Sequence, residues 1–173
     1  LREAICSFKY RGKHTLAQPL ARLMISALPS GLEVDMILPV PLHPIRLRAR
    51  EFNQSLLLAD QLGRYLALPV SATNLVRTAA TEPQTTLTRQ ARLQNLKKAF
   101  AVRRPRDIAE KRILLGDAVF TTGTTLNECA KALRKAGSGP VFALTLARTV
   151  DTDLVPDRHL AEQAAPSLTT IGI

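Results

Sequence analysis

The sequence predicts an α/β fold in which a parallel sheet carries helices on both faces. Short apolar runs that suit buried strands alternate along the chain with amphipathic stretches that suit helices. A predicted strand at residues 112–115, apolar from Ile113 on, and a strongly β-prone run at 141–147 flank a helical stretch at 126–135, as in a parallel strand–helix–strand unit. The chain has 173 residues, of which 46% are apolar, so we expect a single domain with a substantial core.

In the first half of the chain the pattern predicts two helices, a strand, a third helix and a short second strand. The first helix breaks at Arg11 and Gly12. The second carries Leu16, Leu20 and Leu23 on one side and ends before a Pro-Ser-Gly turn. The predicted helices are residues 1–10, 14–28 and 52–66, and the predicted strands are residues 35–40 and 68–70.

In the second half a polar connection leads to a basic helix, a weak strand and then the central strand of the sheet. The connection covers residues 74–83, the helices 88–98 and 126–135, and the strands 100–102, 112–115 and 141–147. The last segment, residues 150–173, is rich in Pro, Asp and Ser, and we expect it to form a loose tail.

Composition excludes several classes of protein. No apolar run approaches the roughly 20 residues that a membrane-spanning helix needs, and we see no cleavable signal at the start. Cys6 and Cys129 lie far apart on helix-like patterns, so we expect buried free thiols rather than a disulfide or a metal site. These observations together predict a protein of the reducing cytoplasm.

Basic residues are concentrated in the body of the chain. Residues 1–150 hold 23 of the 24 basic residues against 10 acidic ones, a net charge of +13, whereas residues 151–173 have a net charge of −3. Such a body attracts a polyanion or neutralises a highly charged ligand. Solvated helix faces explain the same composition equally well.

A hydroxyl-rich turn follows the central strand and opens the next helix. It contains Thr121, Thr122, Gly123, Thr124 and Thr125. The free N–H groups and the dipole of a helix start attract phosphate, glycine permits close backbone approach, and the hydroxyls are further donors. Asp117, which we expect at the end of the strand, is placed to accept hydrogen bonds from sugar hydroxyls. The turn therefore predicts a site for a phosphorylated sugar, although an ordinary capped turn has the same local pattern.

A proline-stiffened loop follows the strand at residues 35–40. Prolines restrict the backbone, and three arginines alternate after them on a segment that we expect to be extended, so that their guanidinium groups project to one side. Guanidinium groups bind phosphate oxygens through paired hydrogen bonds. We expect a pyrophosphate-binding loop whose residues are Val40, Pro41, Leu42, Arg46, Arg48 and Arg50.

Residues 81–95 form a polar stretch that leads into the basic helix. Thr88 can cap that helix, and Arg89, Arg92 and Asn95 fall roughly on one face. We expect a flexible flap, including Gln84, Arg89 and Arg92, that closes over a reactive ligand and excludes water. An exposed connection without a role is the alternative.

The turn at residues 117–125 resembles the phosphoribosyl pyrophosphate (PRPP) signature of type I phosphoribosyltransferases, in which two acidic residues precede Thr-Thr-Gly-x-Thr. Together with the loop and the flap, it resembles the competence protein F (ComF) family in order and spacing. The segments that carry this resemblance are residues 9–12, 39–41, 50–54, 84–95 and 99–100, followed by the PRPP turn.

The resemblance implies a type I phosphoribosyltransferase fold over residues 1–149, with a helical hood at 1–30 and an α/β core at 31–149. It implies binding of PRPP, with Mg²⁺ carried by the ligand. It also implies transfer of phosphoribosyl to a nitrogen nucleophile, with Asp117 as the catalytic carboxylate that holds the ribose diol. It also implies a link to DNA uptake. The N-terminal zinc module of many family members is absent from this sequence.

Two positions depart from the family pattern. Ala118 stands in place of the second acidic residue, and Glu51 stands where the family has glycine. Losing one carboxylate is expected to weaken catalysis more than binding, so the chain is either a slow transferase or a sugar-phosphate-binding protein. The rival interpretation is a non-catalytic protein that binds single-stranded nucleic acid and keeps a vestigial PRPP pocket; a structural relic without a ligand is the third.

Overall fold

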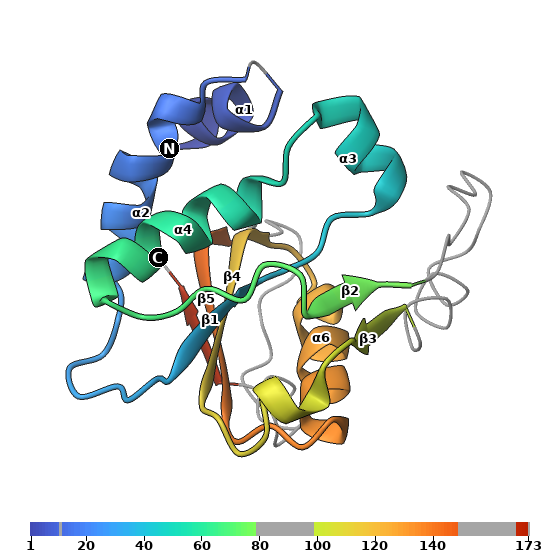
Figure 1. Cartoon of the computed structure of the whole chain (residues 1–173). Coiled ribbons are helices and arrows are strands. Elements are labelled where there is room, and N and C mark those ends of the chain that lie inside the picture. Colours follow the sequence, from blue (N-terminus) through green and yellow to red (C-terminus); the bar gives the residue numbers. More distant parts are fainter. Residues whose placement is uncertain (11, 79–98, 149–168, 173) are drawn as a thin grey trace.

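The computed structural model describes residues 1–10, 12–78, 99–148 and 169–172 and shows a sheet covered by helices (Figure 1). The elements in chain order are α1 (Arg2–Tyr10), η1 (His14–Leu16), α2 (Ala17–Ser26), β1 (Met36–Pro39), α3 (Pro44–Arg50), α4 (Gln54–Leu66), β2 (Leu75–Arg77), β3 (Phe100–Val102), η2 (Pro105–Asp107), β4 (Ile113–Phe120), α6 (Thr124–Lys135), β5 (Val141–Arg148) and β6 (Thr169–Gly172).

The main sheet has the strand order β1-β4-β5-β6, and each neighbouring pair is parallel. Its register pairs Met36 with Ile113 and Ile113 with Val141, so the three strands begin level with one another. All four residues of β1 and the first four of β4 are buried, as expected for parallel strands covered on both faces. The predicted α/β architecture is confirmed.

Two hydrophobic clusters fill the spaces on either side of this sheet. Helices α1, α2 and α4 cover one face and pack against Ile37, Leu114 and Leu144. Helix α6 covers the other face and packs against Leu38, Leu115 and the small β2–β3 sheet (Figure 1). Helix α2 packs directly on α4 and β5, so the helices within residues 1–30 contribute to the same core as the sheet.

Several predicted elements differ from the observed ones for identifiable reasons. Residues 75–77, predicted as a polar connection, form β2, because antiparallel pairing with β3 satisfies the backbone of this short segment. Of the predicted strand at 68–70, Val70 makes an isolated parallel bridge to Ile37. Residues 169–172, predicted to be part of a loose tail, form β6 on the edge of the sheet. The predicted helix at 88–98 lies outside the described residues.

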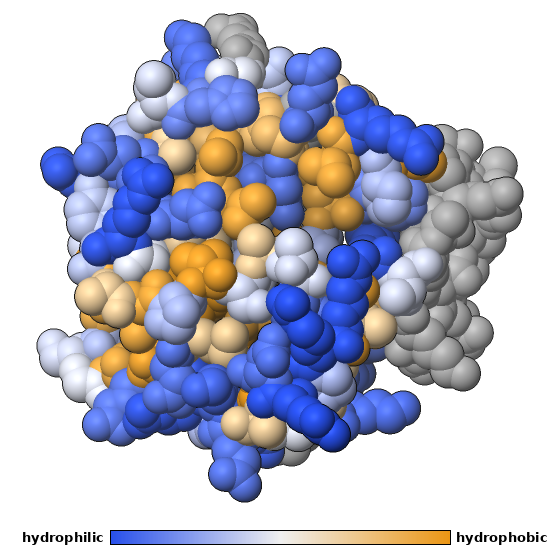
Figure 2. All heavy atoms as spheres, in the orientation of Figure 1, coloured by the Kyte–Doolittle hydropathy of each residue, from blue (hydrophilic) through white to orange (hydrophobic). Residues whose placement is uncertain are grey.

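The two cysteines have different environments. Cys129 is buried in the cluster beneath α6, as predicted, and burial raises the pKa of its thiol. Cys6 is exposed on α1, so the prediction of a buried thiol is wrong there. In the part of the chain that the structure describes, no helix is both long enough and apolar enough to span a membrane. Figure 2 shows hydrophilic side chains around the rim of the molecule and apolar ones nearer its centre.

A carboxylate–guanidinium pair joins the beginnings of β1 and β4. Asp35 accepts hydrogen bonds from Nε and Nη2 of Arg112, at 3.0 and 2.7 Å, and from the Arg112 backbone N–H at 2.7 Å. Arg112 also contacts Glu33. These hydrogen bonds lower the pKa of Asp35 from 3.8 to about 2. The pair therefore holds the two strands in register at their amino ends.

We expect Asp35→Asn to lower stability at neutral pH and to leave a smaller difference in acid. Because the folded-state pKa is depressed, the contribution is fully present above the unfolded value of 3.8 and is lost as pH falls through about 2. Urea unfolding between pH 7 and pH 3 measures this effect, with Asp60→Asn on α4 as the control. A difference from wild type that stays constant over this range would contradict the assignment.

Candidate functional site

The Thr-rich turn lies where β4 gives way to α6, at the carboxyl edge of the parallel sheet. Gly123 has φ 72° and forms the N-cap of α6, so the backbone there is in the left-handed region that favours glycine. The Thr122 and Thr124 hydroxyl oxygens lie 2.9 Å apart. The structure thus brings residues 121–125 together at the start of a 12-residue helix, where the sequence predicted them.

The aromatic ring of Phe120 lies directly beneath this turn. A Cβ atom added to Gly123 would be 2.6 Å from Cζ of Phe120 and 2.9 Å from its Cε2. A side chain at position 123 would therefore displace the ring as well as strain the backbone. This contact is a second reason for glycine in the turn, and the sequence alone does not show it.

Asp117 lies inside β4 and not at its end. The strand continues to Phe120, so the prediction that it ends at the carboxylate is wrong. Asp117 Oδ1 accepts hydrogen bonds from Ser55 Oγ at 2.8 Å and from the Ala118 backbone N–H at 2.7 Å. Burial raises the pKa of the Asp117 carboxyl; the Ser55 hydrogen bond, the Ala118 N–H and the charge of Lys9 oppose this shift.

The start of α4 positions the Ser55 hydroxyl toward Asp117. Asn53 is the N-cap of this helix, and its Oδ1 accepts a hydrogen bond from the Ser55 backbone N–H at 3.0 Å. The Asn53 side-chain amide also donates to the Val40 carbonyl at 3.2 Å. The Asn-Gln-Ser segment thus connects the loop after β1, the start of α4 and the carboxylate of β4. The sequence analysis did not identify Ser55 as a site residue; its position two residues after the capping Asn53 was the available signal.

The arginines of the predicted pyrophosphate loop lie on a helix. Pro44 at the first helical position and His43, whose Nδ1 accepts from the Ile45 N–H at 3.2 Å, start α3. Alternating positions share a side in an extended segment but not in a helix, so the predicted geometry of Arg46, Arg48 and Arg50 is wrong.

The residues before α3 lie close to the site. Val40 is buried and donates its N–H to the Gly116 carbonyl at 3.0 Å, while Pro41 and Leu42 are half-buried. Glu51 ends α3 with φ 62°, in the left-handed region, which accounts for glycine at this position in the family pattern. The predicted flap residues Gln84, Arg89 and Arg92 lie outside the described residues.

Ala118 faces the hydrophobic cluster beneath α2 and α4 and is fully buried. In this chain, therefore, the second acidic position of the motif points into apolar packing. The replacement of an acid by Ala is consistent with its surroundings, since an ionised side chain there would be buried without a partner.

Thr145 on β5 is the register partner of Asp117. Register partners in a parallel sheet point to the same face, so the Thr145 side chain lies beside that of Asp117. It is 1% exposed, and its hydroxyl has no hydrogen-bond partner among the described residues. The sequence analysis did not single out Thr145; the signal for it would have been a single hydroxyl within the apolar run at 141–147.

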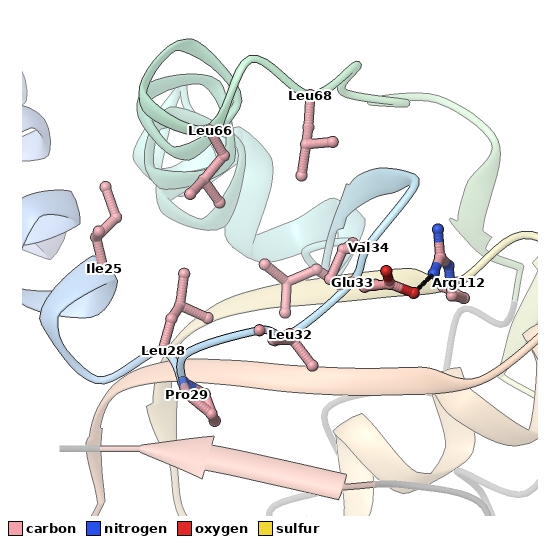
Figure 3. Close-up of a pocket in the computed structure, with 11 residues that line it drawn as sticks. Ile25, Leu28, Pro29, Leu32, Glu33, Val34, Leu66, Leu68 and Arg112 are labelled. Atoms are coloured by element: carbon pink, nitrogen blue, oxygen red, sulfur yellow. Dashed lines mark hydrogen bonds and ion pairs between the residues drawn. The ribbon is translucent and has the colours of Figure 1, made fainter.

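A cavity of about 470 Å³ lies at the opposite edge of the sheet (Figure 3). Apolar side chains from α2, α4 and the segment before β1 line it, and the Glu33–Arg112 pair lies at one side. Because Val34 and Arg112 precede β1 and β4, the cavity is at the amino ends of the strands, remote from the Thr-rich turn.

We expect Ala118→Asp to lower the free energy of unfolding by about 3 kcal/mol at pH 7, because it buries a carboxylate without a partner. Chemical denaturation monitored by circular dichroism measures this loss. Thr121→Asp is the matched control, since position 121 is exposed. Equal stability of the two variants would show that position 118 opens toward solvent.

We expect Asp117→Asn to stabilise the protein at neutral pH. The folded-state pKa is raised above 3.8, so above that pH ionisation lowers the stability of the wild type, and the amide avoids this cost while still accepting from Ser55 and Ala118. Thermal unfolding from pH 3.5 to pH 8 should show the advantage of the variant growing with pH. A variant that is less stable than wild type at pH 7 would contradict the burial of the carboxylate.

Comparison with known proteins gives relatives of one kind. No protein-family model matches the chain. It is 36% identical to competence protein F of Haemophilus influenzae over 148 residues, which are 82% of this chain and 65% of that protein. It is 34% identical to the DNA utilization protein YhgH of Escherichia coli O157:H7 over 152 residues, 84% of this chain and 66% of that protein. The chain therefore spans just under two thirds of the length of these relatives.

Among the solved structures that it resembles are enzymes named for PRPP or for phosphoribosyl transfer. One is glutamine PRPP amidotransferase from B. subtilis complexed with ADP and GMP, with a TM-score of 0.57, 17% identity, and 91% of this chain and 35% of that chain covered. Another is orotate phosphoribosyltransferase from Aeropyrum pernix, with a TM-score of 0.55, 18% identity, and 94% and 72% covered. At these identities the likeness establishes the fold alone, and the predicted fold is confirmed. The chain is therefore a homologue of competence protein F and YhgH, built on the fold of the type I phosphoribosyltransferases.

Proposed function

We propose that this protein binds PRPP or a related sugar phosphate at the carboxyl edge of its parallel sheet. The observation that carries the proposal is the Gly123 turn, a positive-φ glycine at the start of α6 with hydroxyl side chains around it. Free helix N–H groups and the helix dipole favour a phosphate group there. In folds of this type ligands bind beyond the carboxyl ends of the strands.

Each part of PRPP has candidate partners at this edge. Residues 121–125 would hold the 5′-phosphate, and Asp117 would accept hydrogen bonds from the ribose diol. The backbone of residues 40–42, at the loop before α3, would face the pyrophosphate. Ser55 and Ala118 both donate to Oδ1 of Asp117, so the other carboxyl oxygen would accept the hydrogen bonds of the diol.

Mg²⁺ would arrive with the ligand. No group of three or more His, Cys, Asp and Glu side chains that could hold a metal ion occurs among the described residues. A site that offers one carboxylate fits a magnesium ion held mainly by pyrophosphate oxygens, because Mg²⁺ commonly binds substrate phosphates and one or two carboxylates. When bound, the ion would neutralise charge on the pyrophosphate.

Transfer of phosphoribosyl to a nitrogen nucleophile is the reaction that this arrangement would support. The protein would position the sugar and neutralise the leaving group. One diol carboxylate where the family has two removes roughly 2–3 kcal/mol of transition-state binding, which corresponds to turnover slower by about 100-fold. We therefore infer ligand binding with slow catalysis, in a protein whose cellular role, like the names of its relatives, concerns the use of DNA.

A second candidate function is nucleic-acid binding, which a cationic surface at the amino edge of the sheet favours. The backbone of residues 109–111 pairs with that of 137–139, which brings the η2 segment beside the end of α6. Exposed cations of this surface are Arg103, Arg104, Arg106, Lys111, Arg134 and Lys135, against the acidic Asp107 and Glu110. Figure 2 shows hydrophilic side chains along this lower rim. A phosphate backbone would fit such a surface.

Calorimetric titration with PRPP and Mg²⁺ tests the first candidate. We expect one ligand per chain, and we expect Thr122→Val to weaken binding by about 10-fold through loss of a hydroxyl donor to a charged group. Gly123→Ala should abolish binding, because its Cβ would meet the Phe120 ring. The matched control is Gly31→Ala, at φ 78° with open space around it.

Titration with single-stranded oligonucleotides at several salt concentrations tests the second candidate. Binding to oligonucleotides with a steep salt dependence, and no heat with PRPP, would favour nucleic-acid binding and exclude the sugar-phosphate site.

A further inference from the structure

Arg148 ends β5 beside the Thr-rich turn. It is the register partner of Phe120, the last residue of β4 before that turn. Its guanidinium carbon lies 5.1 Å from the centroid of the Phe120 ring, within the range of a cation–π contact. The side chain is exposed, so its hydrogen-bond donors can reach a ligand.

The Phe120 ring links this arginine to the turn itself. Its Cζ atom occupies the space directly beneath Gly123, as the 2.6 Å approach to an added Cβ shows. The Phe120 ring therefore contacts two groups: its Cζ end lies under the Thr-rich turn, and the Arg148 guanidinium lies over the ring. A stacked guanidinium keeps its five N–H donors in the plane of the group, free for an anion.

The turn needs a cation that its own sequence does not contain. Residues 121–125 are four threonines and a glycine, whereas a phosphate monoester carries up to two negative charges. Arg148 has no ion pair with an acidic side chain within the described residues, so its charge is not neutralised by a neighbour there. Hydrogen bonds from guanidinium to phosphate are among the strongest that a side chain can make.

A separate observation indicates that β5 contributes to the site. The Thr145 hydroxyl, three residues before Arg148, is buried without a hydrogen-bond partner in the described part of the chain. It lies beside Asp117, the residue proposed for the ribose diol. Buried polar groups without partners are uncommon, and a role in a functional site is one of the explanations for them. Two residues near the carboxyl end of β5, Thr145 and Arg148, therefore adjoin residues of β4 that belong to the proposed site or lie next to it.

We propose that Arg148 is a phosphate-binding residue that donates to the 5′-phosphate held by the Thr-rich turn, with Phe120 positioning its guanidinium. This inference rests on the proposed function, since it assigns a further residue to the same sugar-phosphate site. Arg148 on the neighbouring strand β5, outside the PRPP motif, would supply the positive charge that the Thr-rich turn lacks.

Calorimetric titration of the full chain with ribose 5-phosphate, and separately with pyrophosphate and Mg²⁺, tests the assignment. Arg148→Gln should weaken ribose 5-phosphate binding by about 10-fold or more, with pyrophosphate binding unchanged within about two-fold. Arg148→Lys should recover part of the loss, because it keeps the charge without the planar fork. A merely structural role would weaken both ligands equally.

Arg22→Gln is the matched control. Arg22 also stacks on an aromatic ring, with its guanidinium carbon 5.6 Å from the centroid of Tyr65. Tyr65 is ten residues along α4 from Ser55, about 15 Å from the site. Arg148→Met, which keeps an unbranched stem over the ring, replaces Arg148→Gln if circular dichroism shows that the glutamine variant does not fold.

The outcomes separate this inference from the function on which it rests. If Arg148→Gln binds ribose 5-phosphate as well as wild type while Thr122→Val does not, the role of Arg148 is overturned and the sugar-phosphate site stands. Equal loss of ribose 5-phosphate and pyrophosphate binding also overturns the role. If the wild-type protein binds neither ribose 5-phosphate nor PRPP, both proposals fail.

Discussion

Strand β4 is the element on which the rest of the structure depends. It is hydrogen-bonded to β1 on one side and β5 on the other, and helices cover both of its faces. A strand in this position has no exposed backbone and no solvated face, so its residues must be apolar until the covering layers end. The first charged residue of β4 is Asp117, near the carboxyl ends of the strands; Ala118 after it is still buried in the core, and the Thr-rich turn follows directly after Phe120. The location of the site is thus a consequence of how the core is buried.

Several unfavourable local features lie at this carboxyl edge. Asp117 is a buried carboxyl with a raised pKa, and the Thr145 hydroxyl has no hydrogen-bond partner among the described residues. Glu51 has positive φ, as Ala67 and Glu110 do elsewhere in the fold. Such features lower stability and persist where the surrounding packing enforces them. At the amino edge the polar groups are instead well paired, as the hydrogen bonds between Asp35 and Arg112 show. The amino edge of the sheet therefore stabilises the fold through paired polar groups, whereas the carboxyl edge has polar groups suited to a ligand.

The cations of the molecule also separate into regions with different surroundings. Arg148 lies beside the Thr-rich turn, whereas the exposed cations near η2 and the end of α6 lie at the amino edge of the sheet. A small anionic ligand at one edge and a polyanion at the other would not compete for the same groups. Because surface charges more than a Debye length of about 10 Å apart are largely screened at 0.1 M salt, the two regions would act independently.

The sequence by itself determined the α/β class, the order of most elements and the place of the Thr-rich turn, because apolar runs, helical spacing and a glycine at a helix start are local signals. It did not determine the geometry of residues 44–50: alternating arginines suggested an extended loop, but the local cap at His43 and Pro44 starts a helix. Only the tertiary structure showed that Ser55 and Thr145 lie beside Asp117, since residues 62 and 28 positions away in the chain meet it only through helix packing and strand register. Only the fold decided, too, that Ala118 faces the core, because the side of a strand that packs against helices depends on elements far away in the sequence.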